Sequence, residues 1–204
     1  MKVFEKFAKR LMDVLVAGFL LLVLSPILLA IGIWIKFDSL GPALFLQERV
    51  GQAGNRFKMF KFRSMVDGAH MTYEEVREKN DQSLNGPYYK DRLDPRITRF
   101  GKFLRTSSID ELPQLLNVLS GDMSLVGPRP AFELEINKMT PQQLQRLSVK
   151  PGLTGLWQVS GRSLLPFEEG LQLDLHYVEN ASIWLDLKIL LKTIPAVASR
   201  KGAF

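Results

Sequence analysis

The sequence predicts an α+β protein that is mainly helical, with a re-entrant membrane helix hairpin at its N-terminus and a small β-hairpin after it. Residues 14–35 contain no charged side chain, and residues 43–62 contain two strand-like segments separated by a turn. Apolar residues recur at helical spacing near the C-terminus. We expect interfacial amphipathic helices around a compact cytoplasmic domain.

The uncharged run at residues 14–35 is long enough to cross a membrane, because a straight helix of this length measures about 33 Å. Asp13 and Lys36 bound it. The simplest interpretation is one transmembrane helix. A cleaved signal peptide is not expected, since the run is too long and no small-residue cleavage site follows it.

Two features favour a helix that enters and leaves the membrane by the same face. Pro26 lies near the centre of the run, where it should bend the helix, and Ser25 can satisfy a carbonyl that the proline frees. Basic residues flank the run on both sides: Lys2, Lys6, Lys9 and Arg10 before it, and Lys36, Arg49, Arg56, Lys58, Lys61 and Arg63 after it. A spanning helix would place one cluster outside, against the usual cytoplasmic bias. We therefore expect a hairpin broken at Ser25-Pro26, with residues 1–37 as the anchor and residues 38–204 as the domain.

Two segments have the pattern of surface helices. Residues 3–11 combine apolar and basic side chains, as in an amphipathic lead-in at the lipid interface. Near the C-terminus a second apolar stripe has Lys188 and Lys192 interspersed, and consists of Ile183, Trp184, Leu187, Leu190, Leu191 and Ile194. This stripe fits either core packing or a face on the membrane surface.

The domain is predicted to consist of short elements. Residues 43–46 and 56–62 resemble strands joined by a turn at residues 51–55. Pro128 and Pro130 bound an extended loop. Helices are expected at residues 112–119, 140–149 (with Pro141 first), 167–178 and 183–199. The polar stretch at residues 67–94 is expected to hold a solvated helix at residues 74–79 and a loop at residues 85–87.

The composition restricts both the partner and the chemistry. The net charge of +6 indicates an anionic partner, which leaves lipid, phosphorylated substrates and nucleic acid open. There is no cysteine, which excludes disulfides, zinc–thiolate sites and thiol nucleophiles. His70 and His176 have no companion at metal-ligand spacing and are expected at the surface or in packing. Nucleophilic or acid–base chemistry must come from carboxylates, hydroxyls or lysines.

A cluster of basic residues precedes the acidic pair Asp110-Glu111. The cluster contains Lys90, Arg92, Arg96, Arg99, Lys102 and Arg105. By itself the acidic pair fits a helix start, because Ser108 and Glu111 match a capping box. Pro113 favours a later start, with Leu112 as the cap. Both alternatives leave the two carboxylates beside the amino end of the helix.

The acidic pair would also suit chemistry on phosphorus. A carboxylate can attack phosphorus and form an acyl phosphate, and amides at a helix start would keep that carboxylate ionised. The neighbouring carboxylate could hold Mg²⁺ bridging diphosphate oxygens. Arg105, Arg129 (in a Gly-Pro-Arg-Pro loop) and Arg162 are candidates to neutralise the phosphate charge.

Several motifs follow one another in a fixed order along nearly the whole chain. After the hydrophobic segment with Ser25-Pro26 come KFRSM (61–65), RTSSIDEL (105–112), NVLSGDMSLVGPRP (117–130), KPGLTGLWQVSGR (150–162), LDLHYV (173–178) and DLK (186–188). This ordered set resembles the bacterial sugar transferase family, the monotopic phosphoglycosyl transferases. The polar stretch at residues 67–94 is longer than in the most compact members of that family.

The resemblance implies a ping-pong reaction on the cytoplasmic face of the bacterial inner membrane. Asp110 would attack the sugar-linked phosphate of a UDP-sugar and release UMP, while Glu111, with Asp110, would hold Mg²⁺. Undecaprenyl phosphate would then accept the sugar phosphate, which initiates synthesis of a surface glycan such as O-antigen, capsule or exopolysaccharide. The residues expected to bind substrate are Lys61, Arg63, Arg105, Arg129, Gln158 and Arg162.

Two other functions remain as alternatives at this point. A basic, membrane-tethered nucleic-acid binder would use residues 90–105, but no aromatic interleaving or recognised fold supports it, and we expect no nucleic-acid partner. A membrane scaffold would use the acidic pair only to cap a helix. No segment identifies the sugar, and the sequence is compatible with an oligomer.

Overall fold

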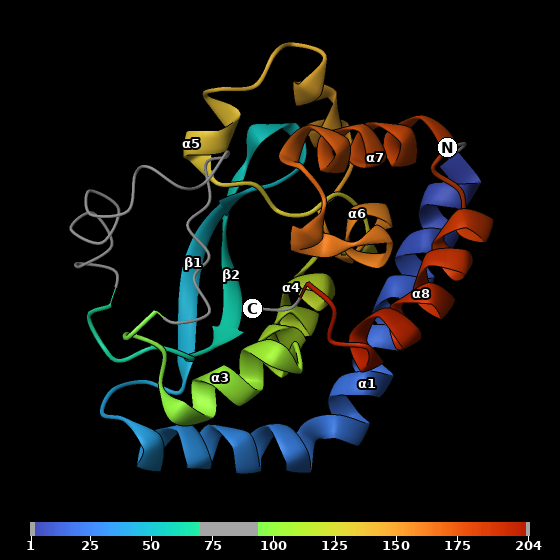
Figure 1. The fold of residues 1–204 in the computed structure, drawn as a ribbon. Helices are drawn as coiled ribbons and strands as arrows, with labels where there is room; N and C mark the ends of the chain where they lie inside the picture. Colours follow the sequence, from blue (N-terminus) through green and yellow to red (C-terminus); the bar gives the residue numbers. More distant parts are fainter. Residues whose placement is uncertain (1–2, 70–93, 203–204) are drawn as a thin grey trace.

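The computed structural model describes residues 3–69 and 94–202. Within them the chain is mainly helical with two small sheets, which confirms the predicted fold class at this level. Figure 1 shows the long helix α1 (Val3–Asp38) running down one side of the molecule and along its base, with the shorter elements on its inner side. The helix and loop predicted within residues 70–93, together with His70, Lys90 and Arg92, lie outside the described residues.

Helix α1 bends between two straight parts. The first part runs beside α8 (Ile183–Ala198), and the second runs beneath α3 (Arg99–Thr106) (Figure 1). Pro26 lies inside this helix. The Ser25 hydroxyl donates to the carbonyl of Leu22 over 2.8 Å, which is the carbonyl that an amide at position 26 would engage in a regular helix. The predicted compensation by Ser25 is therefore confirmed.

Most apolar side chains of α1 face outward. Within the described residues, this is the one helix that is long and apolar enough to cross a membrane. Its outward apolar side chains include Phe4, Phe7, Leu15, Phe19, Leu22, Val23, Ile27, Leu29, Ile33, Trp34 and Phe37. Only Ala17, Ile31 and Ile35 are buried among its apolar residues, against the domain. The core helix of a soluble protein would bury a continuous apolar stripe.

A buried polar network attaches the start of α1 to the domain. Lys9 Nζ donates to Asp186 over 2.5 Å, to the Tyr177 hydroxyl over 3.2 Å and to the carbonyl of Val126 over 3.0 Å. The Tyr177 hydroxyl in turn donates to Asp186 over 2.7 Å. These contacts join α1, α7 (Phe167–Asn180), α8 and strand β3 (Ser124–Val126) at one point.

Two further side chains of α1 turn inward. Arg10 donates to the carbonyls of Val118 and Leu119 over 2.6 and 2.8 Å, at the end of α4 (Leu115–Ser120). Asp13 accepts the amide of Leu125 over 3.0 Å. The prediction of a lead-in with its basic residues at the lipid interface is therefore wrong for Lys9 and Arg10. Their partners lie more than a hundred residues away, so local amphipathicity gave no indication of them.

The predicted hairpin is confirmed. Strands β1 (Leu44–Val50) and β2 (Arg56–Phe62) pair antiparallel, joined by a short 3₁₀ turn, η1 (Gln52–Gly54). The first strand continues to Val50, beyond the predicted residue 46. A second sheet was not predicted, and consists of β3 paired in parallel with β4 (Gly152–Thr154).

The two C-terminal helices match the prediction, whereas the middle of the chain is less regular. Residues 112–119 form the end of a 3₁₀ helix, η2 (Ile109–Gln114), and most of α4. The helix predicted at residues 140–149 is replaced by the shorter 3₁₀ helix η3 (Gln143–Ser148), which ends where Val149 becomes extended. The remaining short elements are α5 (Glu133–Ile136), α6 (Leu156–Ser160) and η4 (Arg162–Leu164).

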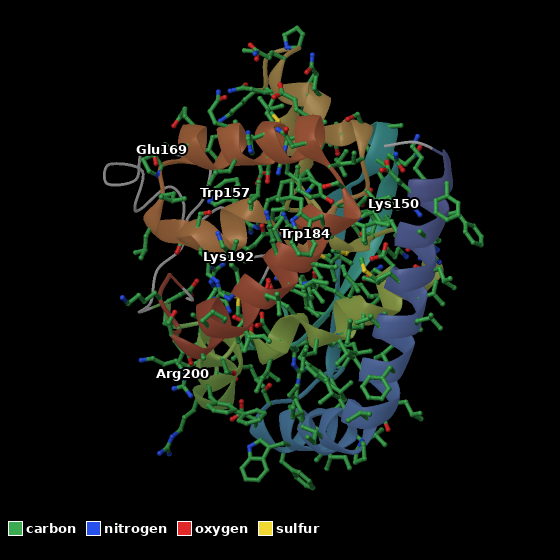
Figure 2. All side chains as sticks on the ribbon, turned by 90° about the vertical axis from the view of Figure 1, so that its right-hand side faces the viewer. Lys150, Trp157, Glu169, Trp184, Lys192 and Arg200 are labelled. Atoms are coloured by element: carbon green, nitrogen blue, oxygen red, sulfur yellow. The ribbon has the colours of Figure 1, made fainter. Side chains whose placement is uncertain are left out.

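The C-terminal apolar stripe is mainly an outer surface. Trp184 is 66% exposed, and Leu191 and Ile194 are each 70% exposed. Figure 2 looks onto the side of the molecule that carries α8 and the first part of α1, and it places Trp184 and Lys192 on this face. The opposite side of α8 packs inward through Asp186 and Ile189. Core packing is thus the wrong interpretation for most of the stripe.

Candidate active site

The acidic pair lies on η2, between α3 and α4 and against strand β2. Ser108 precedes η2 in the left-handed region, with φ of 58°, and its side chain makes no capping hydrogen bond. Pro113 lies inside the 3₁₀ helix. The helix therefore begins directly after Ser108, as the capping-box alternative predicted, but the capping hydrogen bond of its side chain is absent, and the later start at Leu112 is wrong. A left-handed backbone at a residue other than glycine is strained, and such strain gathers at functional sites.

Asp110 is buried, with 8% of its surface exposed. The pKa of its carboxyl is raised to about 6, mainly by burial and also by the adjacent Glu111 carboxylate, whereas Lys61 and Arg105 oppose the shift. The sequence had suggested that amides at the helix start would keep this carboxylate strongly ionised. Desolvation instead dominates, and the result is a more basic carboxylate that is still mainly ionised at neutral pH.

Glu111 extends toward the hairpin and is more exposed than Asp110. Its carboxylate accepts from Lys61 Nζ over 3.0 Å, and 41% of its side chain is exposed. Lys61 lies on β2, so the hairpin brings this cation to the acidic pair. The two carboxylates are thus adjacent in sequence but differ in environment.

Two arginines approach from different elements. Arg105, in the last turn of α3, donates to the Ser64 hydroxyl over 2.9 Å. Arg162, which follows α6, donates to the Ser108 hydroxyl over 3.1 Å and is itself in the left-handed region with φ of 55°. Arg162 therefore contacts the residue that sets the start of η2.

The Gly-Pro-Arg-Pro loop is held by backbone pairing and by a buried ion pair. Gly152 donates to the carbonyl of Pro128 over 2.8 Å. The side chain of Arg146 donates both to Asp174 and to the carbonyl of Arg129, the latter over 2.8 Å. Burial raises the pKa of Asp174 to about 6, although Arg146 and then Arg129 oppose the shift. This pair fixes the backbone from which the Arg129 side chain projects.

All the residues predicted to act on or bind the substrate line one cavity of about 1350 Å³. They are Lys61, Arg63, Arg105, Asp110, Glu111, Arg129, Gln158 and Arg162. They come from β2, α3, η2, α6, η4 and the loops that follow β2 and β3. The folded chain therefore brings the dispersed motifs to one site, which combines two carboxylates with several cations.

Arg63 has an additional role at the end of α1. Its guanidinium donates to the carbonyls of Leu40 and Ser39, each over 2.6 Å, and it is 6% exposed. These carbonyls lie just beyond the last turn of α1, where a helix leaves its carbonyls without intrahelical partners. Arg63 thus joins the bent helix to the end of β2, and its predicted role in substrate binding stays a prediction.

Gln158 presents an unused acceptor. Its Oε1 is buried and has no hydrogen-bond partner among the described residues, although Gln158 lines the cavity. A buried acceptor of this kind is normally paired. The position suits a donor group on a ligand.

Arg49 lines the cavity as well, although it was not predicted as a site residue. Its guanidinium lies 3.2 Å from the ring centroid of Phe132 and donates to the carbonyl of Pro130 over 3.3 Å, so it braces the loop after Arg129. The predicted hairpin contained an indication of this position. Phe45 pairs with Lys61 across the hairpin, and strand alternation places Arg49 on the same face as Phe45, so Arg49 lies on the same face of the hairpin as the predicted site residue Lys61.

An ion pair between Asp94 and Arg96 also lines the cavity and was not predicted. Arg96 donates through Nε and Nη2 to both carboxylate oxygens of Asp94, and both residues are buried. Arg99 and Lys102 are instead exposed on α3. The basic cluster of the sequence is therefore not one continuous patch.

The carboxylate pair fits a magnesium ion shared with a substrate. No third Asp, Glu, His or Cys joins Asp110 and Glu111 in a metal-binding cluster within residues 3–69 and 94–202. Mg²⁺ commonly uses one or two carboxylates and completes its shell with water and substrate phosphates. Two carboxylates beside Lys61, Arg105 and a cavity match that donor set.

Comparison with known proteins identifies the family. Residues 4–200 match the family model described as bacterial sugar transferase. The chain belongs to this family. The match covers nearly the whole chain and includes every motif that suggested the resemblance.

Curated relatives are 41–45% identical to this chain over the aligned residues. "Galactosyl transferase CpsE" of Streptococcus agalactiae is 45% identical over 96% of this chain and 43% of the relative. "Undecaprenyl-phosphate galactose phosphotransferase" of Salmonella typhimurium is 41% identical over 98% of this chain and 42% of the relative. "Exopolysaccharide production protein ExoY" of Rhizobium meliloti is 41% identical over 97% of this chain and 88% of the relative. The chain thus spans less than half the length of the first two.

Proposed function

We propose that this chain transfers a sugar 1-phosphate from a UDP-sugar to undecaprenyl phosphate, as the initiating step of surface glycan synthesis. The observation that carries the proposal is the buried Asp110 carboxylate in a cavity that also presents Lys61, Arg105, Arg129 and Arg162. A nucleophile with a raised pKa beside several cations suits attack on a diphosphate. Relatives are named for galactose, glucose and exopolysaccharide reactions, which agrees with this class of reaction.

The proposed chemistry has two steps. An oxygen of the Asp110 carboxylate attacks the sugar-linked phosphorus, a P–O bond forms, and the bond from that phosphorus to the bridging oxygen breaks as UMP leaves. A phosphate oxygen of undecaprenyl phosphate then attacks the same phosphorus. The acyl phosphate bond breaks, which restores the Asp110 carboxylate and releases the sugar diphosphate lipid.

The residues around Asp110 would neutralise phosphate charge and hold the metal ion. Arg162 contacts Ser108 at the start of η2, and Arg105 lies near enough to Asp110 to oppose the rise of its pKa. Both arginines would neutralise phosphate charge during the two steps. Glu111, with Asp110, would hold Mg²⁺, which when bound would neutralise diphosphate charge. Lys61 bonds Glu111 now and could turn to a phosphate oxygen as the substrate binds.

We also propose that α1 enters and leaves the membrane by the cytoplasmic face. Its bend, the Ser25–Leu22 hydrogen bond and its exposed apolar residues support a re-entrant hairpin. The chain contains no cysteine, so Lys6→Cys and Lys36→Cys can each be labelled alone. Both positions should resist an impermeant periplasmic reagent in intact cells. Labelling of either position would contradict the re-entrant course.

The direct test of function is UMP release from a panel of UDP-sugars with undecaprenyl phosphate and Mg²⁺. Wild type should release UMP with at least one donor, and Asp110→Asn should release none, because a neutral amide is a far weaker nucleophile than a carboxylate and cannot form the acyl phosphate. Asp122→Asn is the matched control, since Asp122 is exposed and does not line the cavity. An active Asp110→Asn protein would remove the proposal.

A further inference from the structure

The cavity that contains Asp110 has an apolar wall, which we call the α1–α8 wall. It is formed by Val16 and Leu20 of α1 and by Leu190, Ile194 and Val197 of α8. A UDP-sugar is polar throughout and offers this wall no apolar group of matching length. The wall is therefore not explained by the donor substrate.

The α1–α8 wall continues onto the outer surface of the protein. Ile194 lines the cavity and is also 70% exposed, so it lies at the rim. Beyond it, α8 presents Trp184 and Leu191, and the neighbouring part of α1 presents Leu15 and Phe19, all exposed. The start of α8 is joined to α1 by the contact of Lys9 with Asp186, and Figure 2 shows α8 sloping away from α1 toward its C-terminal end. One apolar surface thus leads from the outside of the anchor helix into the cavity.

Another part of the wall of the same cavity is charged. Lys61, Arg105, Arg129 and Arg162 line it together with the acidic pair. A ligand that satisfies both walls needs an anionic head and an apolar chain. A polyprenyl phosphate has this structure, and its chain resides in a bilayer.

We propose that the α1–α8 wall binds the first isoprenoid units of the acceptor lipid, so that the chain enters from the membrane between α1 and α8 while its phosphate reaches the reacting phosphorus. This inference rests on the proposed function. It goes further by naming the path along which the acceptor lipid enters the cavity and the residues that contact its chain. It also explains why α8 keeps apolar residues at the cavity rim, where solvent alone would favour polar ones.

Helix α8 provides a matched pair of variants. Ile194 and Leu191 are both 70% exposed, but only Ile194 lines the cavity. Ile194→Asn should raise the KM for undecaprenyl phosphate by about tenfold, the scale of losing an apolar contact in a binding site. Leu191→Asn should leave this KM within about twofold of wild type. UMP release in a single turnover without acceptor measures the donor step alone. It should match wild type in both variants, which would show that both are folded.

The outcomes separate this inference from the proposed function. If wild type transfers sugar phosphate but both variants change the acceptor KM equally, or neither does, the α1–α8 wall does not bind the acceptor. Loss of single-turnover UMP release in Ile194→Asn would likewise overturn the inference, because the residue would then serve the donor site or the fold. If wild type releases no UMP from any UDP-sugar, the proposed function itself fails.

Discussion

Two lysine–carboxylate contacts in this protein have the same chemistry and different surroundings. Lys9 and Asp186 are 2.5 Å apart, and their side chains are 15% and 0% exposed. Lys61 and Glu111 are 3.0 Å apart, and their side chains are 18% and 41% exposed. The first contact joins α1 to α8 in the interior, and the second lies at the cavity beside Asp110.

The difference separates structural charges from reactive ones. Tyr177 and the carbonyl of Val126 complete the hydrogen bonding around Lys9 and Asp186, so that network has no room for a ligand. Glu111 instead keeps two fifths of its side chain exposed, where a metal or diphosphate can approach it. A buried charge pair is costly to break, whereas a half-exposed pair contributes little to stability. We therefore rank the predictions by their effect on the free energy of unfolding.

The largest effect is expected for Lys9→Met. The substitution leaves Asp186 buried without its cation, which should lower the free energy of unfolding by about 3–5 kcal/mol. Denaturant titration in detergent measures this change. Lys6→Met is the control, because Lys6 is exposed on the same helix and should shift stability by less than about 0.5 kcal/mol. Equal stability of the two variants would show that the buried network is not structural.

An intermediate effect, of opposite sign, is expected for Asp110→Asn. The pKa of Asp110 is raised from 3.8 to about 6, so its contribution to stability is present below pH 3.8 and is lost as the pH rises through about 6. The loss amounts to about 2–3 kcal/mol at neutral pH. Asp110→Asn should therefore gain thermal stability relative to wild type between pH 4 and pH 7.5. A constant difference over this range would contradict the assigned pKa.

The smallest effect is expected for Glu111→Gln. Because the Lys61–Glu111 pair is half-exposed, the free energy of unfolding should change by less than about 1 kcal/mol. Transfer activity should nevertheless fall, and part of it should return as the Mg²⁺ concentration is raised. Titration of activity against Mg²⁺ tests this. Strong destabilisation, or a magnesium dependence like that of wild type, would place Glu111 among the structural charges instead.

Local patterns were sufficient to predict the longer elements. The hairpin, α7, α8 and the extent of the N-terminal helix followed from alternation, helical spacing and hydropathy. The parallel pairing of β3 with β4 did not, because each strand has only three residues and depends on contacts across the chain. Likewise, Lys9 pairs with a residue more than a hundred and fifty positions away, and no local pattern contains that information.

The site residues were predictable as a set, but not in their separate roles. Each motif is a short segment that can be recognised in the sequence, and the residues predicted from these motifs all line the cavity. They could not reveal that Arg63 also binds the carbonyls at the end of α1, since that depends on where the helix ends relative to β2. The raised pKa of Asp110 was missed for a similar reason, because burial is a property of the folded protein.

The central claim is that Asp110 becomes covalently attached to the sugar phosphate. Wild-type protein incubated with a UDP-sugar and Mg²⁺ but without acceptor, then digested and analysed by mass spectrometry, tests it directly. We expect one phospho-sugar adduct on the peptide that contains Asp110, lost when undecaprenyl phosphate is added and absent from Asp110→Asn. An adduct on another residue, or UMP release with no adduct at any time, would contradict the account.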